Sequence, residues 1–291
     1  MTVQQGNKVD SHTVLYGVIG DPIRHSKSPL MMNRAFKETG INGIYTAFHI
    51  VPDQLANFIG GVRAMGIRGV NVTIPHKLDV MQHLDHIDDS ALAIGAVNTI
   101  VNDNGRLTGY NTDGIGYVRS LKEEVESDLA GKRVLIFGAG GAARGIIYGL
   151  IQEKVGPIAV ANRTAERAVQ LAGDFSSRAD VYAGEWDKLP ELCADADLII
   201  NTTSVGMYPH TDGIPAEAAW LREGAIASDL IYNPLETRFL QEARGRGCRV
   251  HGGLGMFIYQ GAFAFEYWTG TPAPVSAMRS CVLEALGGSQ P

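Results

Sequence analysis

Short apolar runs alternate with amphipathic helical patterns along most of the chain. The runs are rich in Val and Ile and fall into two series: residues 14–19, 44–50, 67–73 and 97–101, then residues 134–137, 158–161, 198–201, 226–229 and 249–251. Such runs predict buried strands. Helices are predicted to begin at Ser28, Pro52, Pro75 and about Asp113, with two more after Gly253. The alternation predicts an α/β protein built from parallel units.

The two series and the length indicate two domains. A chain of 291 residues can bury two cores of ordinary size. The first series closes with residues 102–105, Asn-Asp-Asn-Gly, which predict a hairpin turn. The junction lies either at Gly131 and Lys132 or before the helix that begins near Asp113, so that this helix already belongs to the second domain.

Composition and charge limit the classes of partner and the cellular locations that we expect for this protein. Hydrophobic residues make up 45% of the chain and charged residues 19%, which is typical of a globular protein. The net charge of -6 disfavours a nucleic-acid surface. The three cysteines have no metal or redox spacing, the N-terminus lacks an apolar leader, and residues 254–268 are interrupted by Gln260 and Glu266. We expect a cytoplasmic protein that contacts neither membrane nor nucleic acid.

A glycine-rich segment directly follows the strand at residues 134–137. It matches G-x-G-x-x-G/A between a strand and a helix, the context that dinucleotide binding requires. Gly138 permits a tight turn, Gly140 lets a pyrophosphate approach the backbone, and Ala143 allows close packing of helix and strand. The alternative is a turn without a ligand. The predicted cofactor contacts in this loop are Gly138, Ala139, Gly140, Gly141 and Ala142.

The end of the next strand predicts which dinucleotide binds. NAD sites carry Asp or Glu there, whereas this chain has Asn162, Arg163 and Thr164, with Arg167 one helical turn later. A guanidinium attracts a ribose 2′-phosphate through charge-assisted hydrogen bonds. The pattern favours NADP over NAD. The alternative is that Thr164 only caps a helix and Arg163 is solvated.

Two segments outside the cofactor loop predict anion and hydroxyl binding. Ser26 and Ser28 place two hydroxyls at a helix start, with Ser28 as the predicted N-cap, and could bind a carboxylate; a plain helix cap is the alternative. Asn71 and Thr73 share one face of a strand, and Lys77 lies just past its end, where α/β sheets place their chemistry. A solvated surface lysine is the alternative for Lys77, and the adjacent His76 is interpreted as structural.

Two further segments carry polar residues with open roles. Asn98 and Asn111 are either ligands or turn residues, and Asp113 is either a ligand or a helix cap. Met256 and Gln260 lie one helical turn apart on one face. A buried glutamine with backbone partners is the alternative for Gln260.

Taken together and in order, these motifs resemble the shikimate dehydrogenase family over about residues 14–286. The matching motifs are Gly20-Asp21-Pro22 with His25-Ser26-Lys27-Ser28-Pro29, Asn71-Val72-Thr73-Ile74-Pro75-His76-Lys77, Gly95-Ala96-Val97-Asn98-Thr99, Asn111-Thr112-Asp113-Gly114, the glycine loop, Asn162-Arg163-Thr164, residues 201–207, and Gly255-Met256 with Gln260. Met32 departs from the family, which often has His there. The resemblance implies an N-terminal α/β substrate domain and a doubly wound Rossmann NADP domain around a cleft. The C-terminal helices would return to the first domain, giving residues 1–112 plus 254–291 and residues 113–253.

The resemblance also implies roles for the residues. Ser26 and Ser28 would hold the substrate carboxylate, and Lys77 and Asp113 would form the catalytic acid–base pair. The ring hydroxyls would be bound by Asn71, Thr73, Asn98, Asp113 and Gln260. The nicotinamide side would be lined by residues 201–207, among them Thr202, Ser204 and Met207, and by Gly253, Met256 and Tyr232, the last also contacting substrate.

The implied activity is that of an oxidoreductase, the NADPH-dependent reversible reduction of 3-dehydroshikimate to shikimate in chorismate and aromatic amino acid biosynthesis. No metal is required. Three alternatives stay open: a quinate/shikimate dehydrogenase that uses NAD, a ligand sensor on the same fold, and a dehydrogenase that shares only the Rossmann half. Both a monomer and a homodimer are compatible with the sequence.

Overall fold

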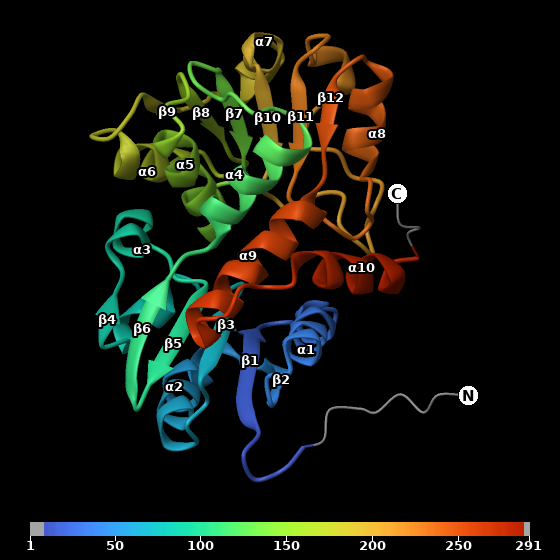
Figure 1. Cartoon of the computed structure of the whole chain (residues 1–291). Coiled ribbons are helices and arrows are strands. Elements are labelled where there is room, and N and C mark those ends of the chain that lie inside the picture. The colour runs from blue at the N-terminus through green and yellow to red at the C-terminus, as the bar shows by residue number, and fades with distance from the viewer. Residues whose placement is uncertain (1–8, 288–291) are drawn as a thin grey trace. The chain divides into compact units, whose positions relative to one another are not determined.

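The computed structural model describes residues 9–287 of the chain. These residues divide into two compact units, residues 9–112 with 260–287, and residues 113–259. Each unit holds a six-stranded sheet (Figure 1). The α/β fold and the return of the last helices to the first unit are confirmed. The unit boundary lies within a helix, between Tyr259 and Gln260, whereas the sequence placed it before residue 254. Residues 1–8 and 288–291 of the predicted first domain lie outside the described residues.

The first unit is built on a mixed sheet with the strand order β2-β1-β3-β5-β6-β4. Its strands are β1 (Val14–Gly20), β2 (Gly43–His49), β3 (Gly69–Val72), β4 (His86–Ile87), β5 (Thr99–Asp103) and β6 (Arg106–Tyr110). Its helices are α1 (Ser28–Thr39), α2 (Leu55–Ala64), α3 (Asp89–Ile94), α10 (Val275–Ala285), the C-terminal part of α9 (Gly253–Thr269), and the short 3-10 helices η1 (Pro52–Gln54) and η2 (Asp79–His83).

The expectation of parallel units throughout is wrong for this sheet. β1 is parallel to β2 and β3, but β5 is antiparallel to both β3 and β6. The predicted hairpin connects β5 to β6, and Asn104 and Gly105 at its tip have φ values of 52° and 92°. Asn and Gly tolerate this left-handed conformation, so the turn reverses the chain instead of leading it into a crossover.

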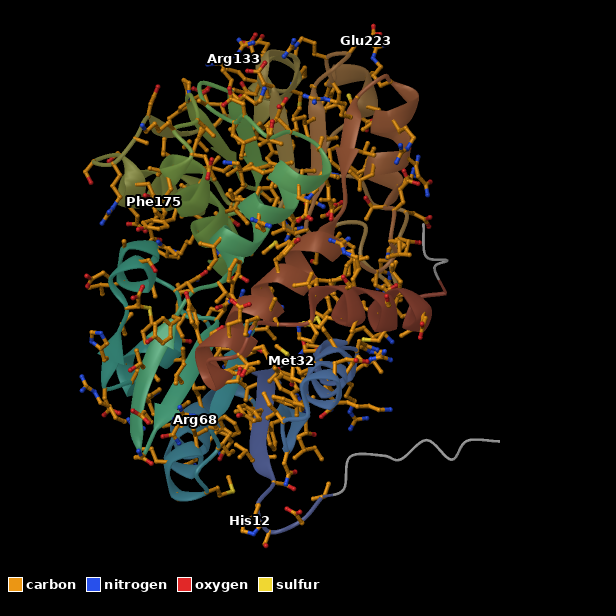
Figure 2. All side chains as sticks on the ribbon, in the orientation of Figure 1. His12, Met32, Arg68, Arg133, Phe175 and Glu223 are labelled. Atoms are coloured by element: carbon orange, nitrogen blue, oxygen red, sulfur yellow. The ribbon has the colours of Figure 1, made fainter. Side chains whose placement is uncertain are left out.

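Both faces of this sheet are covered. On one face, Ile59 and Val62 of α2 pack with Val70 and Val72 of β3. On the other face the cover is aromatic: Tyr16 of β1 lies 4.7 Å from Phe36 of α1 and 5.5 Å from Trp268 of α9, measured between ring centroids. Met32 is fully buried on α1 and close to Gly261 of α9; Figure 2 labels its side chain. Met32 therefore serves packing in this chain.

The second unit has a fully parallel sheet with the strand order β12-β11-β10-β7-β8-β9. Read from the other edge, with the strands numbered within the unit, this is the order 3-2-1-4-5-6 of the Rossmann fold. The strands are β7 (Val134–Phe137), β8 (Ile158–Ala161), β9 (Val181–Ala183), β10 (Leu198–Asn201), β11 (Ile226–Asp229) and β12 (Arg249–His251). The helices are α4 (Asp113–Glu124), α5 (Gly141–Gln152), α6 (Ala165–Phe175), α7 (Leu189–Asp195), α8 (Arg238–Gly245), the start of α9, and the short η3 (Trp186–Lys188) and η4 (Ala218–Trp220).

Alternate side chains of these strands enter two cores. Val134 and Ile136 of β7 pack with α4, α5 and α6, whereas Leu135 and Phe137 pack with α7 and α8. Phe175 of α6, labelled in Figure 2, belongs to the first of these cores. The unit is therefore doubly wound, as predicted.

Helix α4 is held tightly against α5. A Cβ atom at Gly114 would lie 2.2 Å from the Gly145 carbonyl oxygen, and one at Gly149 would lie 2.9 Å from the Gly114 carbonyl oxygen. Only glycine permits such an approach of two helix backbones. This contact fixes the first turn of α4, which begins with Asp113.

The helix predicted from Pro75 does not form. Turns follow Pro75, and only η2 comes after them. Tertiary hydrogen bonds use the local backbone: the Lys77 carbonyl accepts from the Val97 amide at 2.8 Å. The short elements β4, α3 and β9 were not predicted. None of the helices between residues 9 and 287 combines the length and apolar character needed to cross a membrane.

Candidate functional site

Lys77 is carried by a short, well-anchored loop after β3. The loop is fixed by the His76 amide donating to Thr73, by the His76 ring Nε2 2.6 Å from the Ile50 carbonyl, and by the bond from Val97 to the Lys77 carbonyl. Lys77 is only 9% exposed, so it is not a solvated surface lysine. His76 is fully buried and ties the loop to the chain after β2, which agrees with its structural interpretation.

Ser26 and Ser28 lie at the start of α1, with one correction. Ser28 is the first helical residue, and the N-cap position belongs to Lys27, which makes no side-chain capping bond. The Ser26 hydroxyl accepts from the Ser28 amide at 3.2 Å. The Ser26 hydroxyl therefore provides a partner for one of the free backbone amides at the start of the helix. The N-cap lies one position before the predicted one, within the usual uncertainty of helix ends.

Asn71 and Asn98 belong to one buried network of hydrogen bonds. The Tyr45 hydroxyl donates to Asn71 Oδ1 at 2.7 Å, and Asn71 Nδ2 donates to Thr99 Oγ1 at 3.2 Å and to the Asn98 carbonyl at 3.3 Å. Thr99 Oγ1 donates to Asn98 Oδ1 at 2.9 Å, and Asn98 Nδ2 donates to Thr112 Oγ1 at 3.0 Å. Asn98 is therefore a buried network member and not a turn residue.

The network reaches the predicted Gln260 through the backbone. Thr112 Oγ1 donates to the Gln260 carbonyl at 2.9 Å. Asn111 binds the Ala96 carbonyl through its side chain at 2.9 Å, which makes it a structural residue. Thr73 directly follows β3, and its methyl group approaches Gly20 at the end of β1. The first unit thus joins Asn71, Asn98 and the Gln260 backbone in one hydrogen-bonded network.

The glycine loop of the second unit has the shape that a pyrophosphate needs. Gly138 has a φ of 108°, and a Cβ there would lie 2.5 Å from Thr202 Oγ1, which itself donates to the Phe137 carbonyl at 2.7 Å. Gly140 is the N-cap of α5, and a Cβ built on it would meet no protein atom within 4 Å beyond its own neighbours in the chain. The open space at Gly140 and a helix start without a side-chain cap fit a bound phosphate.

The residues predicted to select NADP lie at the end of β8. Arg163, Thr164 and Arg167 are exposed, and Asn162 Nδ2 donates to the Thr164 carbonyl at 2.8 Å. Thr164 occupies the N-cap position of α6, yet its side chain makes no capping hydrogen bond. The interpretation of Thr164 as only a cap therefore loses its basis, and two guanidinium groups face solvent near the first turn of α6.

A buried carboxylate connects the loops after β10 and β11. Asp229 accepts from Asn201 Nδ2 at 3.2 Å, from Thr237 Oγ1 at 2.8 Å and from the Ile231 amide at 3.0 Å. Asn201 also donates to the Val205 carbonyl at 3.1 Å. Burial raises the pKa of Asp229 to about 6, against the opposing effect of these hydrogen bonds.

The remaining predicted residues lie on and beside these loops. Ser204 and Met207 are exposed in one turn, where the Met207 amide donates to the Ser204 carbonyl at 3.1 Å. The Gly253 amide donates to the Ile231 carbonyl at 3.1 Å, and the Tyr232 ring stacks on Phe257 with centroids 4.2 Å apart. Met256 is buried in the core below.

The polar groups described above fit a dinucleotide and an oxygen-rich organic ligand. In the described part of the chain, no group of three His, Cys, Asp or Glu side chains could hold a metal ion. The expectation of a metal-free reaction stays a prediction. What the residues offer is one buried amine, several ordered hydroxyl and amide groups, and a loop open to phosphate.

Comparison with known proteins places this chain in a family. Family profiles match residues 18–100 as a shikimate dehydrogenase substrate binding domain, residues 120–211 as a shikimate / quinate 5-dehydrogenase, and residues 253–282 as a shikimate 5′-dehydrogenase C-terminal domain. A shikimate dehydrogenase (NADP(+)) of Geobacillus kaustophilus is 52% identical over 94% of this chain and 98% of its own length. The chain belongs to the shikimate dehydrogenase family.

Solved structures of the shikimate dehydrogenase family have the same fold. One, a shikimate dehydrogenase in complex with NADP+, is 41% identical, covers 97% of this chain and 99% of its own, and has a TM-score of 0.90. Another, from Thermus thermophilus in complex with NADP(H) and shikimate, is 38% identical with a TM-score of 0.84, covering 94% of this chain and 100% of its own. The resemblance stated from the motifs is confirmed.

Four buried polar residues of this shikimate dehydrogenase family member, three in the Asn71–Asn98 network and one in the second unit, were not singled out from the sequence. Tyr45, Thr99, Thr112 and Asp229 are all buried polar groups at strand ends or on strands. Thr99 and Thr112 stood inside the family motifs without a role, and Asp229 ended a predicted strand. Tyr45 gave no signal, because an aromatic residue in an apolar strand is expected for packing alone.

Proposed function

We propose that this chain is an NADP-dependent oxidoreductase that reversibly reduces 3-dehydroshikimate to shikimate, a step of chorismate and aromatic amino acid biosynthesis. The observation that carries the proposal is the buried Lys77 beside an ordered network of hydroxyl and amide groups in one unit. A nearly full-length relative with 52% identity supports the same activity, since it is a shikimate dehydrogenase (NADP(+)).

The first unit binds the polyhydroxylated acid in this proposal. The free proton of the Ser26 hydroxyl, whose oxygen already accepts from the Ser28 amide, is available to a carboxylate, and Ser28 lies beside it. Asn71, Thr73, Asn98 and Gln260 bind the ring hydroxyls. These hydroxyl and amide groups match a ligand rich in hydroxyl groups.

Lys77 is the proposed proton donor. Reduction of a ketone places negative charge on its oxygen, and an ammonium group stabilises that charge and supplies the proton. In the reverse direction, the same amine takes the proton from the alcohol. Asp113, which follows Thr112 directly in sequence, is the proposed partner that orients Lys77 and completes the acid–base pair.

The second unit holds the cofactor. NADPH bound there supplies the hydride. The backbone of Gly138, Ala139, Gly140, Gly141 and Ala142 would bind the pyrophosphate at the start of α5. Arg163 and Arg167 would bind the 2′-phosphate, with Asn162 and Thr164 beside them, and their charge disfavours the NAD alternative.

The loops after β10 and β11 would contact the nicotinamide. Thr202, Ser204 and Met207 lie on the first loop, and Tyr232, Gly253 and Met256 lie on or next to the second. In functional terms, residues 1–112 with 254–291 form the substrate domain and residues 113–253 the NADP domain. We propose that the enzyme works in the cytoplasm, as a monomer or a homodimer, on a small molecule without nucleic acid.

The test is oxidation of shikimate and of quinate, each with NADP+ and with NAD+, followed by absorbance of the reduced cofactor. We expect a strong preference for shikimate with NADP+. Comparable rates with quinate or NAD+ would contradict the proposed substrate or cofactor preference, but not the role of Lys77 as proton donor. No activity in any of the four combinations would favour a ligand sensor instead.

A further inference from the structure

Five side chains and one backbone carbonyl form a continuous line of hydrogen bonds through the first unit. The contacts run in the order Tyr45, Asn71, Thr99, Asn98, Thr112 and the Gln260 carbonyl oxygen. Tyr45, Thr99 and Thr112 have no role in the function proposed above, yet Tyr45 binds Asn71, Thr99 links Asn71 to Asn98, and Thr112 links Asn98 to the Gln260 backbone. All three are 2% exposed or less.

Which group donates in each of these hydrogen bonds follows from the backbone groups at the Gln260 end of the line. The Gln260 carbonyl can only accept, so Thr112 Oγ1 must donate to it and can only accept from Asn98 Nδ2. The Thr112 amide independently donates to Asn98 Oδ1 at 2.9 Å, which sets the same orientation of the Asn98 amide. Thr99 then donates to Asn98 Oδ1 and can only accept from Asn71.

The Asn71 amide is fixed in the same way. Its Nδ2 faces two acceptors, Thr99 Oγ1 and the Asn98 backbone carbonyl. A flipped amide would place two oxygens against each other, so Oδ1 must face Tyr45. The Tyr45 hydroxyl therefore donates to Asn71 at 2.7 Å. Burial raises the pKa of Tyr45 well above its ordinary value, so the phenol keeps the proton that it donates.

We propose that Tyr45, Thr99 and Thr112 are positioning residues that make Asn71 a pure acceptor toward the substrate. Both amide hydrogens of Asn71 are used within the protein, and only a lone pair of Oδ1 is left for a ligand. Asn71 then accepts from a hydroxyl group and rejects a carbonyl or ether oxygen at the same position, because two acceptors repel each other. This selects an alcohol at one ring carbon of the substrate. The inference rests on the proposed function, in which Asn71 binds a ring hydroxyl.

The first test is Tyr45→Phe, which removes one hydroxyl and keeps the ring. The matched control is Tyr16→Phe, because Tyr16 is a buried tyrosine on the neighbouring strand whose ring also packs on Trp268. We expect Tyr45→Phe to raise the KM for shikimate between about fivefold and a hundredfold, as for loss of a buried hydrogen-bond partner, with the KM for NADP+ unchanged. Tyr16→Phe should change neither. An unchanged KM and kcat for shikimate in a folded Tyr45→Phe variant would overturn the proposal.

A second pair keeps the test decisive if Tyr45→Phe does not fold. Thr99→Val removes the hydroxyl that holds Asn71, whereas Thr99→Ser keeps it. Thr99→Val should raise the KM for shikimate, and Thr99→Ser should restore a value near that of the wild type; equal values for both would overturn the proposal. The assay of the wild type separates failure of this inference from failure of the proposed function. If the wild type has no activity with shikimate, the proposed function is refuted before any variant is compared.

Discussion

Lys77 is the residue whose replacement tests the chemistry most directly. An amine that is 9% exposed in a loop anchored at three points is held for a purpose other than solubility. We expect Lys77→Ala to lower kcat for shikimate oxidation by roughly 10²- to 10⁴-fold, the usual contribution of a general acid–base group. The KM for NADP+ should stay nearly the same, because the proposed cofactor residues belong to the other unit. Steady-state kinetics with both substrates varied measures the two effects.

Lys37→Ala is the control, since Lys37 is exposed on α1. It should behave like the wild type. Unchanged turnover in Lys77→Ala would remove Lys77 from the mechanism, and a rise in the KM for NADP+ alone would make Lys77 a cofactor residue.

Arg163 carries the prediction on cofactor choice. Its guanidinium is exposed at the end of β8, beside a Thr164 hydroxyl that caps no helix. Loss of a charge-assisted hydrogen bond costs about 1.5–3 kcal/mol, so Arg163→Ala should raise the KM for NADP+ by roughly 10- to 150-fold. The KM for NAD+, which lacks the 2′-phosphate, should not rise. An equal loss with both cofactors would instead assign Arg163 to a shared part of the dinucleotide, and Arg246→Ala, an exposed arginine at the end of α8, controls for net charge.

At the residue scale, the sequence indicates residues with distinctive chemistry but does not indicate the residues that only position them through hydrogen bonds. Lys77 and Ser28 stand out because a charged or small polar residue interrupts an apolar pattern. Tyr45 does not, since its ring belongs in a buried strand and only its distance to Asn71 reveals the hydroxyl's role. Pairings between strands far apart in sequence create such roles, and no local pattern encodes them.

At the scale of elements, Asp229 joins the ends of β10 and β11 to the start of α8, and its ionisation should be visible in stability. Its pKa is raised from 3.8 to about 6 in the folded chain, mainly by burial. The folded state therefore binds this proton more tightly than the unfolded state. Stability from this group is fully present below the unfolded pKa and is lost as pH rises through about 6.

The variant Asp229→Asn cannot titrate at this position. Relative to it, the wild type should gain free energy of unfolding as pH falls from about 7, above the folded pKa of about 6, to about 4, near the unfolded value of 3.8. Urea denaturation at several pH values measures the gain. Other carboxylates titrate in both proteins and cancel in the difference. Parallel pH profiles for the two proteins would show that the folded chain does not raise the pKa of Asp229.

Strands could be predicted from the sequence where both faces of the sheet are buried, because such strands are continuously apolar. Five strands of the second unit have the predicted bounds, because a parallel sheet covered on both faces leaves only short apolar runs between turns. Short elements such as β4 and β9 lack that signal. The helix expected from Pro75 failed for a different reason: the Lys77 carbonyl bonds to Val97 instead of to a following helical turn.

At the scale of the whole molecule, most of the proposed substrate residues and the proposed cofactor residues belong to different units, each with a sheet and a core of its own. Each ligand should therefore leave its own footprint in hydrogen exchange of the full-length chain. A ligand at about a hundred times its Kd stabilises the form that binds it by about 2.7 kcal/mol, enough to slow local opening strongly.

Shikimate alone should slow exchange of rapidly opening amides around residues 26–28, 71–77 and 98–99, and NADP+ alone around residues 138–144 and 162–167. Mass spectrometry of peptides from these segments makes the comparison, with helix α8 as an internal reference that neither ligand contacts in this proposal. Protection of residues 138–167 by shikimate alone, with none at residues 71–77, would reverse the assignment of the two domains. Protection by NADP+ in the first unit alone would do the same, because a ligand stabilises first the segments whose amides and side chains it binds.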